Sequence, residues 1–475
     1  MKRFSLFSAT AFLAAILTLL APVSGKGAPK LALVHGTLIN PADGKITSDS
    51  TVLIEGTKIA AAGSPNESKL SPEIKGIDCT GKFILPGYID THVHFFQSGG
   101  LFARPDVVDL TSVRPYQEEV AWTKSHLEDT FARYLRSGIT SVVDVGGPMW
   151  NFEARKIANA TAKAPRVAVA GPLISSVARP QLDLGDPPIV KIDTPEQGRE
   201  FVRKLAAHHP DYVKIWYIVS PEKPAASFRP VVHAVIEESH ARKLRVAVHA
   251  TELEAARAAA EEGADLLVHS VTDKPVDDAF VRLLQKHGTM LTPTLVVFER
   301  YGRTFAHQLN LTAEEKSWGN PEVLATLDVT KLPPDKVPDR IKTALEKPDA
   351  VLAHIQQTYD VALKNLKTLE DAGIPIAAGT DAGNIGTIHG PALFREFQLM
   401  KEAGLTNMQI LRSATVMAAK AFGGETGAKI GSIAPGQNAD LVVLNSNPLD
   451  DIAHTSDIQT VIKNGVVYPA DSLLR

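Results

Sequence analysis

Between residues 83 and 424 the chain alternates short apolar runs, typical of buried strands, with longer helical stretches. Glu252–Glu262 and Leu352–Ala372 are examples of the helical stretches. This alternation indicates β-α units, in which each helix returns the chain to a parallel neighbouring strand. Eight such strands predict an α/β fold, a (β/α)8 TIM barrel. The candidate strands are Phe83–Asp90, Ile139–Asp144, Arg166–Ala170, Tyr212–Trp216, Leu244–Val248, Leu266–Val268, Met290–Val297 and Ile374–Ala378.

The segments on either side of this region have a different pattern. Residues 26–82 and 425–475 contain short β-like runs that are separated by Gly-, Pro- and Asn-rich turns, without a helical period. We expect these two segments to pack together as a small β-sandwich domain beside the barrel of residues 83–424. The runs are Leu31–Val34, Val52–Glu55, Lys58–Ala61, Leu441–Leu444 and Val461–Val467.

One interval of the barrel region, residues 298–349, is too long for a simple connection. Long insertions at the catalytic face of a barrel often serve as lids. This segment is therefore either a lid insertion or a passive surface excursion. Its prolines are Pro321, Pro333, Pro334, Pro338 and Pro348.

Residues 1–25 have the pattern of a cleavable secretory signal peptide. Lys2 and Arg3 precede the apolar stretch Ala11–Leu20, and small residues follow at a plausible cleavage point. The apolar stretch is too short to span a membrane. The sequence therefore predicts a periplasmic or secreted protein without membrane attachment after cleavage, and an uncleaved anchor is the alternative.

Composition narrows the class of partner. The net charge of -3 gives no electrostatic reason to expect nucleic acid binding. Cys79 is the only cysteine, so no intrachain disulfide can form, and a chain of this size has core enough without one. A small-molecule partner is the expectation, and a homo-oligomer is possible.

Chemically active side chains follow several of the predicted strands. His92 and His94 come just after the first, and alternate residues of an extended strand point to the same side, so both rings can reach one metal ion. His249 and His269 end two consecutive strands, and Asp381 follows the last one. Each histidine could instead be a core residue, and the aspartate an N-cap. Because barrel active sites lie at the carboxyl ends of the strands, a shared metal site is favoured.

Lys214 lies within the apolar run Tyr212–Trp216, where a bare ammonium group would be costly to bury. Burial and nearby cations lower the pKa of a lysine, and the neutral amine can react with carbon dioxide. The resulting carbamate is an anion with two oxygens that could bridge two metal ions. The alternative is a lysine that pairs with a buried acid.

Taken together, these residues resemble the amidohydrolase superfamily. The segments Gly81–His94 and Gly431–Leu444 resemble the family's entry into its first strand and its return to the second domain. Gly138–Gly147 and Asp381–Asn384 resemble the branch of imidazolonepropionases and prolidases with a carboxylated lysine. Because imidazolonepropionases typically lack the strand-four lysine, Lys214 favours the binuclear, Xaa-Pro dipeptidase-like group.

The resemblance implies a ligand set and a reaction. His92, His94 and Asp381 would hold one divalent ion, His249 and His269 a second, and the carbamate of Lys214 would bridge them, with zinc the preferred metal. A metal-bridged hydroxide would attack the amide or peptide bond of a dipeptide such as Xaa-Pro or of an N-acyl amino acid. Asp381 would accept the water proton and pass it to the leaving nitrogen.

Four further residues are weaker candidates from their positions. Tyr217, just past the fourth strand, could donate to the developing oxyanion, or it could be packing. His389 could contact substrate, or it could be a solvated loop residue. Asp144 could orient a ligand histidine, or it could form a helix cap or a turn, and Arg179 is either a site for a substrate carboxylate or a surface charge.

Two other functions stay open at this point. A cyclic amide or imidazolone hydrolase would have one metal ion and an unmodified Lys214. A non-catalytic binding protein that kept the barrel would function without any metal.

Overall fold

The computed structural model describes residues 30–64 and 74–474. The predicted signal peptide lies outside these residues. Within them, no helix has both the length and the apolar character required to cross a bilayer.

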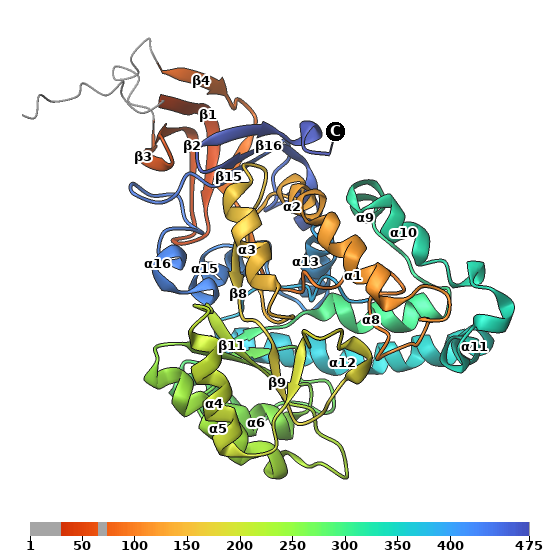
Figure 1. Cartoon of the computed structure of the whole chain (residues 1–475). Helices are drawn as coiled ribbons and strands as arrows, with labels where there is room; N and C mark the ends of the chain where they lie inside the picture. The colour runs from red at the N-terminus through yellow and green to blue at the C-terminus, as the bar shows by residue number, and fades with distance from the viewer. Residues whose placement is uncertain (1–29, 65–73, 475) are drawn as a thin grey trace, which may run out of the picture.

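Strands from both ends of the chain pair in one eight-stranded sheet, seen at the top of Figure 1. The order is β17-β16-β15-β5-β1-β2-β3, and β4 also pairs with β1. The two ends meet where Val442 of β15 lies opposite Leu85 of β5 in an antiparallel pair. The strands are β1 (Lys30–Asn40), β2 (Lys45–Glu55), β3 (Lys58–Gly63), β4 (Lys75–Asp78), β5 (Phe83–Pro86), β15 (Leu441–Leu444), β16 (Ile458–Lys463) and β17 (Val466–Pro469).

Two predicted strands of this region are wrong because each is two strands. Phe83–Asp90 divides at Gly87, where a Cβ would lie 2.4 Å from Thr140. Its first half is β5 of the terminal sheet, and its second half begins β6 (Tyr88–Val93) of the barrel region. Val461–Val467 divides at Asn464 and Gly465, whose φ angles of 50° and 76° form the hairpin between β16 and β17.

The central strands are parallel throughout and form two sheets. One has the order β6-β7-β8 and the other β10-β9-β11-β12-β13-β14. A backbone hydrogen bond from Asp211 to Val169 connects the two sheets on one flank, and on the other flank the chain at β6 is bonded to the segment 378–382, from Thr91 to Ala378, from Asp381 to His92 and from His94 to Ala382. The arrangement is therefore barrel-like. The remaining strands are β7 (Ile139–Asp144), β8 (Arg166–Val169), β9 (Leu173–Ser175), β10 (Ile189–Lys191), β11 (Tyr212–Trp216), β12 (Arg245–His249), β13 (Leu266–Val268) and β14 (Met290–Thr292).

The last two predicted barrel strands are shorter than expected. β14 ends at Thr292 because Pro293 has no N–H to continue the ladder, and Thr294 turns the chain into a helix with a φ of 46°. The segment Ile374–Ala378 forms only an isolated bridge to Leu291 rather than a strand. Its backbone nonetheless hydrogen-bonds to β14 on one side and to β6 on the other.

Helices surround the parallel strands (Figure 1). They are α1 (Tyr116–Ser125), α2 (Leu127–Arg136), α3 (Asn151–Ala160), α4 (Pro195–Ala206), α5 (Ala225–Ala241), α6 (Leu253–Glu261), α7 (Asp278–His287), α12 (Pro348–Asp371), α13 (Ala392–Glu402), α14 (Asn407–Ser413), α15 (Val416–Phe422) and α16 (Gly424–Gly427).

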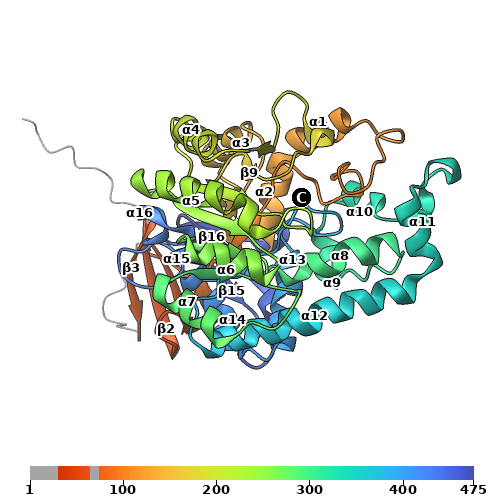
Figure 2. The same ribbon diagram turned by 90° about the horizontal axis from the view of Figure 1, so that it is seen from below.

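The interval 298–349 is helical rather than an irregular loop. Its helices lie away from the terminal strands in both views (Figures 1 and 2). Pro321 and Pro348 occupy the first turns of α10 and α12, where a missing N–H costs nothing. A separate apolar cluster that includes Leu101, Val323 and Ile341 fastens the insertion to the barrel. The helices are α8 (Leu295–Phe305), α9 (Ala313–Trp318), α10 (Pro321–Thr326) and α11 (Asp339–Glu346).

Candidate metal centre

A cavity of about 380 Å³ opens at the carboxyl ends of the parallel strands. All six side chains that the sequence predicts as metal ligands line it: His92, His94, Lys214, His249, His269 and Asp381. They come from β6, β11, β12, the residue after β13, and the segment that follows Ile374–Ala378. Their convergence is a property of the fold, while their role as ligands stays a prediction.

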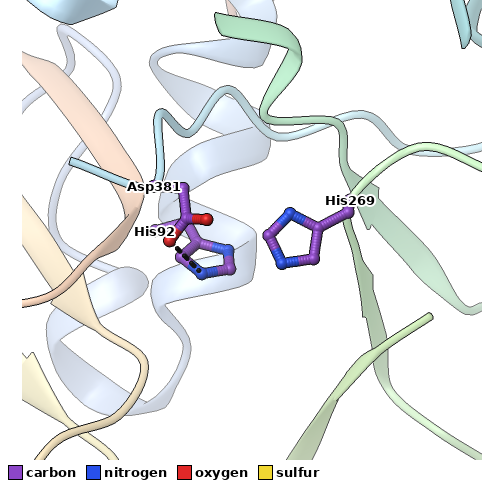
Figure 3. A group of neighbouring side chains, drawn as sticks. All are labelled: His92, His269 and Asp381. Carbon is purple, nitrogen blue, oxygen red and sulfur yellow. Dashed lines mark ion pairs between the residues drawn. The ribbon is translucent and has the colours of Figure 1, made fainter. Parts of the chain in front are cut away.

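The distances between these side chains suit metal binding. Asp381 Oδ1 lies 3.2 Å from His92 Nε2 and 3.0 Å from His94 Nε2. The ring centroids of His92 and His269 are 4.9 Å apart, and those of His249 and His269 are 4.5 Å apart. One donor atom each from His92, His269 and Asp381 lies within 4.8 Å of the other two (Figure 3).

The hydrogen bond made by His94 Nδ1 determines the state of the other ring nitrogen, Nε2. Its Nδ1 lies 2.6 Å from the carbonyl oxygen of Gly146, and a carbonyl only accepts, so Nδ1 carries the hydrogen. In the neutral ring Nε2 then presents a lone pair to Asp381 Oδ1 at 3.0 Å. Two lone pairs at this distance repel each other unless a proton or a cation lies between them.

Several buried polar atoms at this place lack a hydrogen-bond partner among the described residues. They include both ring nitrogens of His92, Lys214 Nζ and Asp381 Oδ1. Buried polar groups are normally paired because leaving one unpaired costs free energy. These nitrogen and oxygen atoms gather around one cavity, and cations that bound there would satisfy them.

The pKa shifts of these histidines favour the neutral imidazole, which is the form that binds metal ions. Burial lowers the pKa of His92 to about 3 and takes the pKa values of His249 and His269 well below the ordinary range. Burial alone would raise the pKa of Asp381, but the neighbouring His92 and His94 hold it well below its usual value. Neutral imidazoles beside an ionised carboxylate form the donor set of zinc and related ions.

Lys214 is 1% exposed, and burial lowers its pKa to about 7. A substantial part of this amine is therefore uncharged at neutral pH. No carboxylate of the described residues lies within ion-pair distance of its Nζ, although the charge of the nearby Asp381 opposes the effect of burial on the pKa of Lys214. A carbamate would give this nitrogen the anionic oxygens that the surrounding imidazoles and bound cations favour.

Asp381 does not cap a helix, because α13 begins only at Ala392. Its backbone adopts a left-handed φ of 63°, and its N–H donates to the His92 carbonyl at 2.8 Å. The preceding Thr380 donates from its hydroxyl to buried Asp90 at 2.7 Å. These contacts fix a strained turn that aims the carboxylate at the histidines.

The sequence and structure comparisons agree with this geometry. The amidohydrolase family model matches residues 83–468. This chain belongs to the amidohydrolase family. Family members with solved structures support a TIM-barrel-like α/β fold with a second domain, and divalent metal ions are the cofactors of the superfamily.

Two relatives resemble most of the chain. A 5'-deoxyadenosine deaminase from Methanosarcina barkeri is 24% identical over 91% of this chain and 90% of its own. An ochratoxinase from Aspergillus niger is 23% identical over 89% of this chain and 83% of its own. A local match to a putative adenine deaminase from Halalkalibacterium halodurans, 38% identical over 16% of this chain, covers only 13% of that protein.

Solved structures give the same fold. A Xaa-Pro dipeptidase with methionine bound in its active site superposes with a TM-score of 0.69, at 23% identity, over 93% of this chain and 100% of the other. The A. niger ochratoxinase structure also has a TM-score of 0.69, at 21% identity, over 93% of this chain and 96% of its own. Membership of the amidohydrolase family supports a hydrolase, and the solved structures show the same fold; the bond and the substrate stay open.

Two catalytic residues predicted from the sequence do not reach the cavity. The Tyr217 hydroxyl is buried and donates to the Ala225 carbonyl, which argues against an oxyanion contact. His389 Nε2 must donate to the Gln97 carbonyl at 2.8 Å, so its Nδ1 accepts from the Tyr134 hydroxyl. With both nitrogens occupied, His389 supports the backbone of Gln97 rather than contacting substrate.

Asp144 and Arg179 each follow one of the alternatives left open by the sequence. Asp144 accepts from the Gly146 N–H and, at 2.6 Å, from Asn151 Nδ2, and it does not touch a histidine. It positions His94 indirectly, by holding the turn whose carbonyl accepts from that ring. Arg179 lies over the Trp216 ring, 4.9 Å from its centroid, outside the residues that line the cavity.

The sequence did not point to six polar residues of the cavity: Gln97, Arg104, Thr251, Tyr301, Arg340 and Asn384. The first and last follow His94 and Asp381 closely, and nearness to those ligands was the available signal. Tyr301 and Arg340 come from the insertion, where no periodicity points to the site.

Proposed function

We propose that this protein is a binuclear metal-dependent hydrolase that cleaves an amide or peptide bond in a small substrate, either a dipeptide such as Xaa-Pro or an N-acyl amino acid. The observation that carries the proposal is the group of buried atoms on Lys214, His92 and Asp381 that form no hydrogen bond among the described residues, at one end of the cavity, where Asp381 Oδ1 faces the Nε2 atoms of His92 and His94. Such atoms are costly without cations and well suited to binding them.

In this proposal the ligands divide into two sets. His92, His94 and Asp381 would hold one ion, and His249 and His269 would hold the other, with zinc the preferred metal. Lys214 joins the sets as a carbamate, and its lowered pKa supports this because the neutral amine is the form that reacts with carbon dioxide. When bound, the ions supply Lewis acidity and lower the pKa of water.

The chain's own residues then position the substrate and move the proton. Asp381 accepts a proton from the attacking water and delivers it to the departing nitrogen. The left-handed turn at Asp381 and the hydrogen bond from His94 to Gly146 hold the participating groups in place. Because Tyr217 is turned away, the charge that develops on the substrate oxygen is left to the metal centre.

The activities of similar proteins support this class of substrate. One structure is a Xaa-Pro dipeptidase, and its bound methionine shows that its active site accepts an amino acid. The deaminase relative supports a wider range of bonds. These activities belong to the other proteins, and hydrolysis of a substrate panel decides among them for this chain.

The test is hydrolysis of a panel of dipeptides, N-acyl amino acids and cyclic amides by the zinc-loaded protein and by the same protein after chelation. We expect linear amides to be cleaved only by the metal-loaded form. Cleavage of cyclic amides alone, with one ion per chain and an unmodified Lys214, would establish the mononuclear alternative. Function that survives chelation would favour a binding protein.

We also propose export to the periplasm or the medium, on the basis of the pattern in residues 1–25. The measurement is amino-terminal sequencing of the protein recovered from each cell fraction. A start near residue 26 outside the cytoplasm is expected, and an intact cytoplasmic chain would contradict the proposal.

A further inference from the structure

The cavity contains two arginines in different electrostatic states. Arg104 donates to both carboxylate oxygens of Asp106 at 2.7 Å, and the Asp106 side chain is 1% exposed. A third nitrogen of Arg104 donates to Asn384 Oδ1 at 2.7 Å, which also accepts from the Tyr301 hydroxyl. The charge of Arg104 is therefore partly neutralised, since Asp106 also lies 3.5 Å from Arg179 Nε, and its donors are engaged in holding Asp106 and Asn384.

Arg340, on α11 of the insertion, is not neutralised in this way. Its one hydrogen bond is to the backbone carbonyl of Val107, at 3.1 Å, and its guanidinium lies over the Phe305 ring, 5.3 Å from the centroid. No carboxylate of residues 30–64 and 74–474 lies within ion-pair distance of it. Arg340 is exposed and lines the cavity, so most of its donors are available to a ligand.

The remainder of the cavity wall is largely apolar. Its apolar side chains come from the barrel, from the loop that contains Val107 and from α8: Phe96, Val107, Leu173, Ile189, Trp216, Val297 and Phe298. Asp381 is the only carboxylate among the lining residues. A ligand that fills this space therefore meets apolar side chains along its body and an unpaired cation at the insertion.

We propose that Arg340 is a specificity-determining residue that binds the carboxylate of the substrate, so that the enzyme selects amides with an apolar body and an anionic end. The inference rests on the proposed hydrolase function and adds to it the group that recognises charge. A guanidinium binds a carboxylate through two parallel charge-assisted hydrogen bonds, which a neutral amide or ester cannot match.

The experiment compares N-acetyl-L-phenylalanine with its methyl ester, using zinc-loaded wild-type protein and the variants R340M and R340K. We expect R340M to lower kcat/KM for the acid by about 10- to 100-fold, mainly through KM, and to leave release of acetate from the ester within about threefold. R340K keeps the charge but loses the planar fork, so it should be intermediate. K342A, on the same helix and exposed, should match the wild type.

Equal losses on both substrates would show a structural role for Arg340 and overturn the inference, as would no loss on either. Calorimetric binding of the same two compounds separates this inference from the hydrolase proposal. If neither compound is cleaved but the acid alone loses affinity in R340M, the recognition of charge holds and the proposed reaction fails. If wild-type protein binds both equally, Arg340 does not select for charge.

Discussion

The two walls of the cavity are built differently. The barrel wall presents side chains from strand ends, most of them buried and held by the backbone, as the left-handed turn at Asp381 and the Gly146 contact of His94 illustrate. The insertion wall presents side chains from helices that pack through their own apolar cluster, and its charged group, Arg340, is exposed. The comparison indicates that the chemistry belongs to the barrel and the selection of substrate to the insertion.

The largest expected effect is that of D381N on the barrel wall. Removing the ionised carboxylate takes away both a metal ligand and the proton carrier, so we expect kcat/KM to fall by about 10³-fold or more on acid and ester substrates alike. Steady-state kinetics with the paired substrates measures it. D335N, an exposed acid of the insertion, serves as the control. A loss confined to the acid substrate would contradict the assignment of the chemistry to the barrel wall and of substrate selection to the insertion wall.

K214M should separate activity from stability. Without the bridging ligand we expect activity to fall by about 10²-fold or more and the bound metal to decrease. Because methionine removes a buried amine without a hydrogen-bond partner, the metal-free variant should be more stable than metal-free wild type, by about 1–3 kcal/mol. Thermal unfolding in chelator measures the second effect, and K191M, at an exposed lysine, is the control. A lower Tm would mean that Lys214 has a partner in the metal-free protein.

D144N tests positioning behind the barrel wall. The new amide group would face Asn151 Nδ2 or the Gly146 N–H with a donor in place of an acceptor, and the turn that holds His94 would loosen. We expect about a 10- to 100-fold loss of metal affinity or activity, since groups that orient ligands have effects of this size. Zinc titration of metal-free protein gives the affinity. Unchanged affinity and activity would show that His94 does not depend on this turn.

The smallest effect belongs to Y217F. Because the hydroxyl contacts the Ala225 carbonyl instead of the cavity, we expect kcat/KM to stay within about threefold and stability to fall by about 1 kcal/mol. Urea unfolding and kinetics on the same preparation check both values. A large decrease in kcat with unchanged stability would restore the oxyanion role that the sequence suggested.

The barrel wall was accessible from the sequence because its signals are local. A short apolar run that ends in histidine predicts both a strand and the face to which the ring points, and His249 and His269 lie where this reasoning places them. The predicted strand boundaries are wrong at Gly87 and at Pro293, because the apolar run continues past the residue at which the strand ends. The secondary contacts of His389 also escaped this reasoning, because they depend on which backbone carbonyl lies opposite the ring.

The insertion wall could not be predicted in the same way. Its helices are short, and proline-rich turns connect them, so the direction of α11 is set by tertiary packing of residues such as Ile341 and not by periodicity. Arg340 consequently had no signal that distinguished it from other surface arginines. The pairing of Arg104 with Asp106 depends likewise on a loop conformation that the sequence does not specify.

The most direct test of the central claim is the number of ions needed for activity. Metal-free protein is titrated with zinc in bicarbonate buffer, and bound metal and hydrolysis of a linear amide are measured at each step, together with the ¹³C signal of a labelled carbamate. The account predicts that activity reaches its maximum at two ions per chain and that the carbamate signal appears with it and is absent in K214M. Full activity at one ion per chain, without the carbamate signal, would contradict it.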